Sequence, residues 1–248
     1  MKSAIRQFIT KAIAWTLPLT IWLAVKYGFQ ISDRYLPSPI GVFSAANSLG
    51  PALLIDTLHT SIRIILSFVL GLGFGLTTAL LCFRASLLRH LIPMVNALRA
   101  VPPIAMVPFF LLWFGFSEWG KILLLTAGLG LNVFVAIADK LESPDRDATI
   151  MFKSFDIEPR TLVSQYWFQA TLEGLLPTLR FGLAMAIGVA LVAEMLGSQT
   201  GLGHVIQISR ATFSMDVIFL AAAILGTITV AFDRLLIVFW RHLIYWKQ

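Results

Sequence analysis

The stretch RAVPPIAMVPFFLLWFGF, residues 99–116, combines the apolar character of a membrane span with residues that break helices. Pro102, Pro103 and Pro108 interrupt a run of Ile, Met, Phe, Leu and Trp. Proline lacks a backbone N–H and its ring clashes with the preceding turn, so these prolines predict a broken helix. Broken helices are tolerated at membrane depth only where protein or a water-lined cavity satisfies the freed backbone groups. The stretch is therefore a candidate for a pathway or gate through a membrane.

The composition of the whole chain predicts a membrane protein. Of its 248 residues, 58% are hydrophobic and 13% are charged, and the mean hydropathy is +0.83. Soluble domains have about 45–50% apolar and about 25% charged residues. No segment is long and polar enough to form a separate soluble domain. We therefore expect residues 1–248 to form a single all-α, polytopic transmembrane domain embedded in the lipid bilayer.

Apolar segments of nearly the length needed to cross a bilayer recur along the chain. A crossing helix needs about 20 mostly apolar residues. The first segment follows three basic residues, but no small-residue cleavage pattern comes after it, so we expect an uncleaved span rather than a signal peptide. About six transmembrane helices are predicted, at residues 12–28, 60–83, 90–115, 119–139, 174–196 and 217–240. The bias of Lys and Arg between alternate connections predicts that both termini are cytoplasmic.

Two connections between these spans are long. Residues 29–58, on the predicted outer side, read as a proline-punctuated turn followed by a short interfacial helix. Residues 140–173, on the inner side, mix charges with apolar residues at spacings of three and four, which predicts short amphipathic helices. Such helices either lie on the bilayer surface or dock into a groove on a cytoplasmic partner.

Charged residues inside the predicted spans are candidates for function, because each costs roughly 2.5–3.5 kcal/mol on insertion scales. Arg99, Arg180 and Glu194 are expected to face the bundle interior or an aqueous path. Arg63 and Asp233 are nearer to span ends, where snorkelling or pairing is an equal alternative. In the second span, Gly71 and Gly75 have the GxxxG spacing, for which packing within the subunit is favoured over a dimer seam.

The chain has no motif that supplies energy or catalysis. It contains no GxxxxGK[ST] phosphate loop, and its His and Cys residues do not have metal-ligand spacing. We therefore expect no catalytic residue, no metal and no cofactor in this chain. The net charge of +6 is explained by Lys and Arg in cytoplasmic loops, and no basic groove with stacking aromatic residues predicts nucleic-acid binding.

Four stretches, in this order, resemble the permease subunits of the nitrate/sulfonate/taurine class of ABC importers, the binding-protein-dependent inner-membrane components. They are YLPSPIGVF (35–43), TLHTSIRIILSFVLGLGFGL (57–76), RAVPPIAMVPFFLLWFGFSEWGKILL (99–124) and LRFGLAMAIGVALVAEMLGSQTGLGHVI (179–206). The last is similar to the family's fifth span with its Arg, its Glu and its Ser-x-x-Gly-Leu-Gly loop, here at Arg180, Glu194, Ser198, Gly201, Leu202 and Gly203. The resemblance covers about residues 35–240.

The resemblance implies a type I ABC importer permease-like fold in the bacterial inner membrane. Two copies of the permease would form the translocation path, two cytoplasmic ATP-binding subunits would hydrolyse ATP–Mg below it, and an extracytoplasmic solute-binding protein would deliver the solute. The implied solute is an alkanesulfonate, taurine, nitrate or related oxyanion, or a pyrimidine vitamin precursor. The residues predicted to line or gate the path are Arg99, Pro102, Pro103, Pro108, Arg180 and Glu194.

The resemblance also places ATPase coupling in the inner loop, at about residues 146–168. The family's loop carries a Glu-Ala-Ala motif, a Gly and a Leu-Pro pair. Here no Glu-Ala-Ala is present, Asp156 stands at the expected Gly, and Phe168 and Gln169 stand at the expected Leu-Pro. The coupling residues predicted from this placement are Phe152, Phe155, Asp156, Ile157, Pro159 and Arg160.

Two other functions compete with the importer. The chain would act as an ion-coupled secondary transporter if Glu194 or Asp233 exchanged protons or ions, but no inverted repeat of broken spans supports this. An inert membrane scaffold is the third alternative. The charges inside the spans argue against it, because a scaffold gains nothing from their cost.

Overall fold

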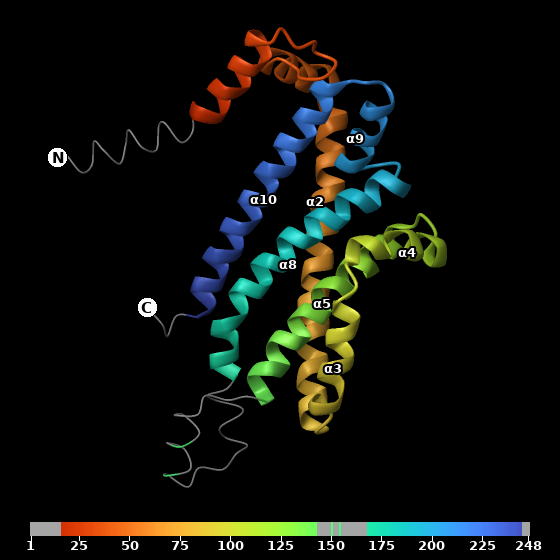
Figure 1. Ribbon diagram of the computed structural model, residues 1–248. Helices are drawn as coiled ribbons and strands as arrows, with labels where there is room; N and C mark the ends of the chain where they lie inside the picture. The colour runs from red at the N-terminus through yellow and green to blue at the C-terminus, as the bar shows by residue number, and fades with distance from the viewer. Residues whose placement is uncertain (1–15, 143–149, 151–153, 155–167, 245–248) are drawn as a thin grey trace, which may run out of the picture.

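The computed structural model describes residues 16–142, 150, 154 and 168–244, and the described chain is built from helices and short connections without strands (Figure 1). Residues 16–28 form a first helix. The remaining elements are α2 (Pro39–Arg84), α3 (Leu88–Arg99), the 3₁₀ turn η1 (Pro103–Met106), α4 (Val107–Phe114), α5 (Glu118–Glu142), α8 (Phe168–Gly197), α9 (Leu202–Ala211) and α10 (Met215–Leu243). The predicted all-α fold is confirmed.

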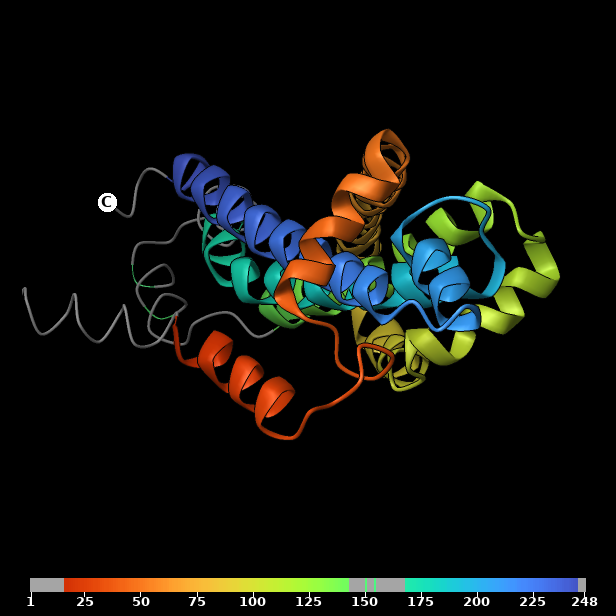
Figure 2. The ribbon, with the colours of Figure 1, turned by 90° about the horizontal axis from the view of Figure 1, so that it is seen from above.

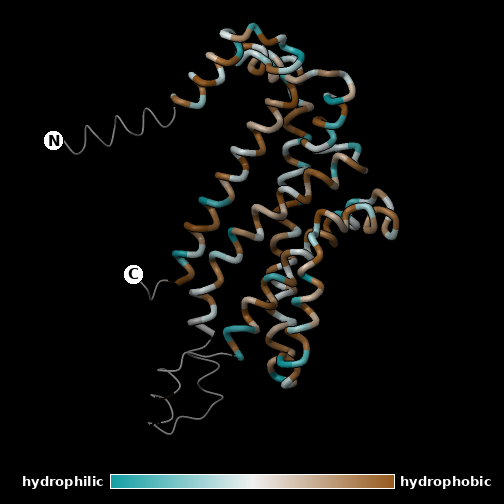
Figure 3. The backbone as a smooth tube through the Cα atoms, in the orientation of Figure 1, coloured by the Kyte–Doolittle hydropathy of each residue, from teal (hydrophilic) through white to brown (hydrophobic). Residues whose placement is uncertain are grey.

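Four helices of the described chain are long and apolar enough to cross a membrane. They are α2, α5, the Gly174–Gly197 part of α8, and α10. The segments Leu88–Arg99 and Pro103–Phe114 make a fifth candidate span, bent by 74° at the break between them. The predicted first span begins at residue 12, and residues 12–15 lie outside the described part. In Figure 3 the hydrophobic colour dominates these long helices.

The second span begins earlier than the sequence predicts. Helix α2 contains a break at Gly50, whose φ of 51° and ψ of −134° suit glycine, and Pro51 follows it. The part before Gly50 lies across the end of the bundle, and the part after it runs along the bundle (Figures 1 and 2). The helix expected in residues 29–58 corresponds in position to the segment before the break, and its interfacial location stays a prediction. Residues 51–58 extend the second long helix. The apolar residues after Pro51 continue the helix, and Thr57 Oγ1 donates a hydrogen bond back to the Leu53 carbonyl at 2.7 Å.

Helix α5 is the centre of the bundle, in contact with α2, α3, α4 and α8. Small residues let it approach α2 closely. A Cβ atom on Gly71 would lie 2.9 Å from Leu129 Cβ, and one on Gly75 would lie 2.6 Å from the Gly130 carbonyl oxygen. The GxxxG pair of the second span therefore packs within the subunit, as the sequence analysis favoured.

The first helix is held to α10 and to the connection that leads into α2. The Trp22 ring lies 5.6 Å from the Phe219 ring of α10, and its Nε1 donates to the Pro37 carbonyl at 3.1 Å. Lys26 Nζ lies 3.0 Å from Asp33 Oδ1. The hydrogen bond from Lys26, with that from the Ser38 N–H, holds the pKa of Asp33 below its usual range. Seen along the bundle, this helix lies beside the other helices rather than among them (Figure 2).

Candidate functional site

A buried ion network joins α2, α5 and α8 near the end of the bundle where α5 begins and α8 ends. Arg63 of α2 pairs with Glu194 of α8 through its Nη1. Arg63 Nε also donates to Glu118 Oε2 at 2.7 Å, and Glu118 Oε1 accepts from Lys121 Nζ at 2.9 Å. Arg63 and Lys121 are each 2% exposed and Glu194 is fully buried. The Glu118 side chain is 53% exposed, so it joins the network at its solvent-facing edge. Two positive and two negative side chains neutralise one another in the network, which offsets the cost of burying Arg63, Lys121 and Glu194.

The Glu194 carboxylate also holds the loop that leads into α9. Glu194 Oε2 accepts hydrogen bonds from Thr60 Oγ1 at 2.9 Å and from the Gly203 N–H at 2.8 Å. Thr60 Oγ1 in turn accepts from the Leu202 N–H at 2.9 Å. On α2, Asp56 Oδ1 accepts from the Gly201 N–H at 2.7 Å. The loop is therefore tied to α2 and α8 through its backbone N–H groups.

The Gly-Leu-Gly sequence of this loop has a physical reason in Glu194. Gly201 has a φ of +108°, and a Cβ atom there would lie 2.5 Å from Glu194 Oε2. A Cβ atom on Gly203 would lie 2.5 Å from Glu194 Cβ and from the Leu191 carbonyl oxygen. Only glycine allows the loop backbone to approach the carboxylate this closely. Glu194 is thus engaged in holding the loop, and its predicted role in gating stays a prediction.

The prolines of residues 99–116 lie at the starts of helical segments. Pro102 is the extended residue before η1, Pro103 is the first residue of η1, and Pro108 is the second residue of α4. Proline is tolerated at such positions because the N–H that it lacks has no partner within the helix. The prolines therefore set the break between α3 and α4, and the 74° bend follows from them. The predicted broken helix is confirmed.

The bend and the middle of α5 enclose a pocket of about 170 Å³. Its walls are apolar except for Arg99, from the end of α3, and Asn132, from α5. Asn132 is 9% exposed, and its Nδ2 donates to the Gly128 carbonyl at 2.7 Å. The remaining lining residues are Leu98, Val101, Pro103, Met106, Phe110, Leu124, Ala127, Gly128 and Leu131. The structure thus brings Arg99 and Pro103 together beside Asn132.

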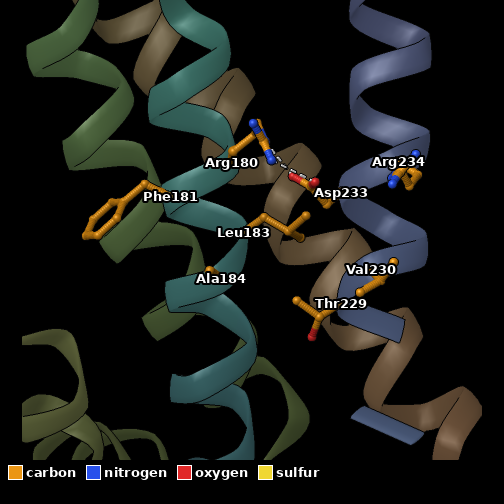
Figure 4. A pocket seen from close by; sticks show the side chains of 8 residues that line it. All are labelled: Arg180, Phe181, Leu183, Ala184, Thr229, Val230, Asp233 and Arg234. Carbon is orange, nitrogen blue, oxygen red and sulfur yellow. Dashed lines mark hydrogen bonds and ion pairs between the residues drawn. The ribbon is translucent and has the colours of Figure 1, made fainter. Parts of the chain in front are cut away.

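A second polar site lies between α8 and α10. Arg180 Nε and Nη2 donate to Asp233 Oδ1 and Oδ2 at 2.6 and 2.9 Å. The Arg180 side chain is 50% exposed and that of Asp233 is 26% exposed, beside a hollow of about 490 Å³. Figure 4 shows the two side chains reaching toward each other from the two helices. Snorkelling and pairing were the two alternatives for Asp233, and the structure shows pairing with Arg180.

The predicted pathway residues therefore fall in three places. Arg99 and Pro103 line the pocket at the bend, with Pro102 and Pro108 flanking it in sequence. Arg180 lies on the open face between α8 and α10. Glu194 is fourteen residues further along α8, about 21 Å at 1.5 Å per residue, within the buried network. The predicted coupling residues Phe152, Phe155, Asp156, Ile157, Pro159 and Arg160 lie outside the described residues.

Sequence reasoning missed several members of the buried network. Glu118 and Lys121 were not among the predicted site residues, although their spacing of three residues on one helix was a usable signal. Helix α9 was read as part of a loop, although apolar residues recur in it at helical spacing. Within the described chain, no group of three or more His, Cys, Asp or Glu residues is placed to hold a metal ion.

Comparison with known proteins connects this geometry to a family. Residues 71–244 match the family described as binding-protein-dependent transport system inner membrane component. The putative aliphatic sulfonates transport permease protein SsuC of Bacillus subtilis is 30% identical over 236 residues, which are 93% of this chain and 84% of that protein. The formylaminopyrimidine transport permease protein ThiX of Halalkalibacterium halodurans is 29% identical over 195 residues, which are 75% of this chain and 78% of that protein.

Among solved structures, an inward-facing conformation of the MetNI methionine ABC transporter contains a chain with a similar fold. The TM-score is 0.59 at 20% sequence identity, and the match covers 77% of this chain and 97% of that chain. This likeness shows that the chain shares the helical fold of that transporter chain.

Proposed function

Because the chain belongs to the family of binding-protein-dependent transport system inner membrane components, we propose that it forms the translocation path of an ATP-driven importer for a small oxyanion. Two copies of the chain form the path, cytoplasmic ATP-binding subunits drive it, and an extracytoplasmic solute-binding protein delivers the solute. The chain itself is the permease subunit. ATP hydrolysis belongs to the separate subunits, and the importer lies in the bacterial inner membrane with both termini of this chain in the cytoplasm.

The broken third span carries the assignment of the path. A bend of 74° in an apolar segment leaves backbone groups without helical partners, and these are tolerated where they line a cavity. The pocket at this bend contains Arg99 and Asn132 among apolar walls. A few polar groups in an apolar cavity are the usual composition of a small-solute site. Transporters build solute sites from broken helices of this kind.

The solutes named for two relatives suggest the solute class of this chain. One relative is described as transporting aliphatic sulfonates and another as transporting formylaminopyrimidine. In the proposed path, Arg99 at the pocket and Arg180 between α8 and α10 would each supply a guanidinium group. Guanidinium binds planar or tetrahedral oxyanions through paired N–H groups. These residues favour a sulfonate or a related oxyanion over a neutral pyrimidine.

Purification from native membranes tests the assignment. A tagged chain is extracted in a mild detergent, and co-purifying proteins are identified and quantified by mass spectrometry. The expected result is an ATP-binding subunit in stoichiometric amounts with two copies of this chain. Absence of an ATPase in several detergents, together with uptake driven by a proton gradient, would overturn the proposal and favour an ion-coupled secondary transporter.

A further inference from the structure

The Arg180–Asp233 pair lies within the apolar part of both helices. Arg180 is six residues after Gly174, where the apolar span of α8 begins, which places it about 9 Å into the span. Asp233 is ten residues before Leu243, the last residue of α10, or about 15 Å from that end. Charged groups inside membrane spans rarely face lipid and mark solute or ion paths. The open face between α8 and α10 therefore borders water or protein.

The hollow beside the pair carries a net positive charge. It is lined by Arg180, Arg234 and Asp233, with Thr229 and four apolar residues, so its formal charge is +1. Asp233 occupies the Nε and Nη2 donors of Arg180, and no hydrogen bond to Nη1 is present among the described residues. A singly charged oxyanion that entered this hollow would neutralise it and would meet a guanidinium already held in position by α10 (Figure 4).

We propose that Arg180 is an oxyanion-binding residue in the cytoplasmic half of the path and that Asp233 is its exchangeable counter-ion. The proposal rests on the importer function proposed above. When the path is empty, Asp233 holds both forked donors of Arg180. A sulfonate group displaces the Asp233 carboxylate from these donors, and the carboxylate takes them back when the solute leaves.

Competition by an internal carboxylate has a measurable consequence. Asp233 holds the paired Nε and Nη2 donors of Arg180, so the solute gains these two hydrogen bonds only by breaking those to Asp233. This exchange weakens solute binding and speeds solute release. Removing the charge of Asp233 should therefore tighten oxyanion binding and slow transport, whereas removing the charge of Arg180 should weaken binding. These opposite signs separate an exchange site from a structural ion pair, for which both variants would act in the same direction.

The test uses the permease–ATPase complex in nanodiscs and measures equilibrium binding of radiolabelled ethanesulfonate, with ethyl methyl sulfone as an uncharged competitor. We expect Asp233→Asn to bind ethanesulfonate about tenfold more tightly than wild type and Arg180→Gln about tenfold more weakly, the range for hydrogen bonds to charged groups. The double variant Arg180→Gln/Asp233→Asn keeps a neutral hydrogen-bonded pair and should fold normally. It should lose the preference for ethanesulfonate over the uncharged sulfone. Arg241→Gln, a charge removed from the last turn of α10, should bind as wild type.

Two results would overturn the proposal. The first is an affinity pattern without opposite signs. Either ethanesulfonate affinity is unchanged in Arg180→Gln, or it falls equally in Arg180→Gln and Asp233→Asn. The other is displacement of ethanesulfonate when phosphatidylglycerol replaces part of the phosphatidylcholine, which would assign the hollow to a lipid headgroup. ATP hydrolysis is measured on every sample. If the complex assembles and hydrolyses ATP but the binding results are those above, the exchange site is refuted and the importer function stands. If the wild-type chain does not assemble with an ATPase, the importer function itself is refuted.

Discussion

Arg63 of α2 and Glu194 of α8 form an ion pair in which both side chains are buried, although 131 residues separate them in the sequence. Glu118 and Lys121 of α5 complete the network. The pair therefore connects three membrane-spanning helices and, through the Gly203 N–H, the loop before α9. It fixes one end of the bundle, whereas the bend after Arg99 and the open face beside Arg180 are the places where the helices leave space.

Breaking this pair should destabilise the protein strongly. Arg63→Met leaves Glu194 buried without its charge partner, which costs about 3–5 kcal/mol in comparable buried pairs. Thermal unfolding in detergent, followed by loss of the monodisperse chromatographic peak, measures the effect. Arg63→Met combined with Glu194→Gln should recover much of the loss, because no uncompensated charge remains and the amide oxygen can still accept from Thr60 Oγ1 and the Gly203 N–H. Arg84→Met, an exposed charge in the last turn of the same helix, should change stability by less than about 1 kcal/mol. Equal stability of Arg63→Met and Arg84→Met would refute the role of the pair.

The close packing of α2 on α5 should be sensitive to a single methyl group. Gly75→Ala places a Cβ 2.6 Å from the Gly130 carbonyl oxygen and 2.7 Å from Val133 Cβ, so the helices must separate. We expect a loss of about 1–3 kcal/mol from overpacking. Gly73→Ala is the matched control on the same helix, since nothing lies within 4 Å of its added Cβ. Unfolding temperatures compare the two, and a Gly75→Ala variant as stable as Gly73→Ala would contradict the packing.

The bend should matter for transport more than for insertion. Pro102→Ala with Pro103→Ala allows α3 to continue toward α4 and removes a wall of the pocket that contains Arg99. We expect import to fall severalfold, while the amount of protein in the membrane is maintained. Pro93→Ala, a proline inside α3 that does not line the pocket, is the control. Wild-type uptake in the double variant would remove the path from this pocket.

The inner loop should carry the contact with the ATP-binding subunits. Phe155→Asp replaces an apolar residue of the predicted amphipathic segment by a charge, which should abolish co-purification of the ATPase, since apolar anchors dominate helix-in-groove docking. Phe155→Leu keeps the apolar character and should retain the ATPase. Quantitative mass spectrometry of the purified complexes measures both. Undiminished association in Phe155→Asp would favour helices that lie on the bilayer surface.

Much of this structure follows from patterns that are local in the sequence. Apolar runs of span length predicted the long helices, and three prolines predicted the break in the third span. The family resemblance drawn from four ordered stretches is confirmed by the match of residues 71–244. Each of these signals depends on residues that are close together in the chain, so a single sequence contains them.

The partners of the intramembrane charges could not be predicted in the same way. Arg63 was equally compatible with a snorkelling position, and only the packing of α2 against α8 brings it to Glu194. The sequence did not indicate which carboxylate would pair with Arg180, because Asp233 lies 53 residues away on another helix and only the packing of α8 and α10 brings the two together. The early start of α2 was also missed, because the polar residues Asp56 and His59 resemble loop residues in the sequence. In the structure Asp56 lies on the helix and accepts a hydrogen bond from the Gly201 N–H.

Import by the reconstituted complex distinguishes an ATP-driven importer from an ion-coupled transporter. This chain and its ATP-binding subunits are placed in proteoliposomes with ATP enclosed, and the solute-binding protein loaded with a radiolabelled alkanesulfonate is added outside. We expect accumulation that requires both ATP and the binding protein and that persists when ionophores collapse all ion gradients. Accumulation without ATP that stops when the proton gradient is collapsed would contradict it.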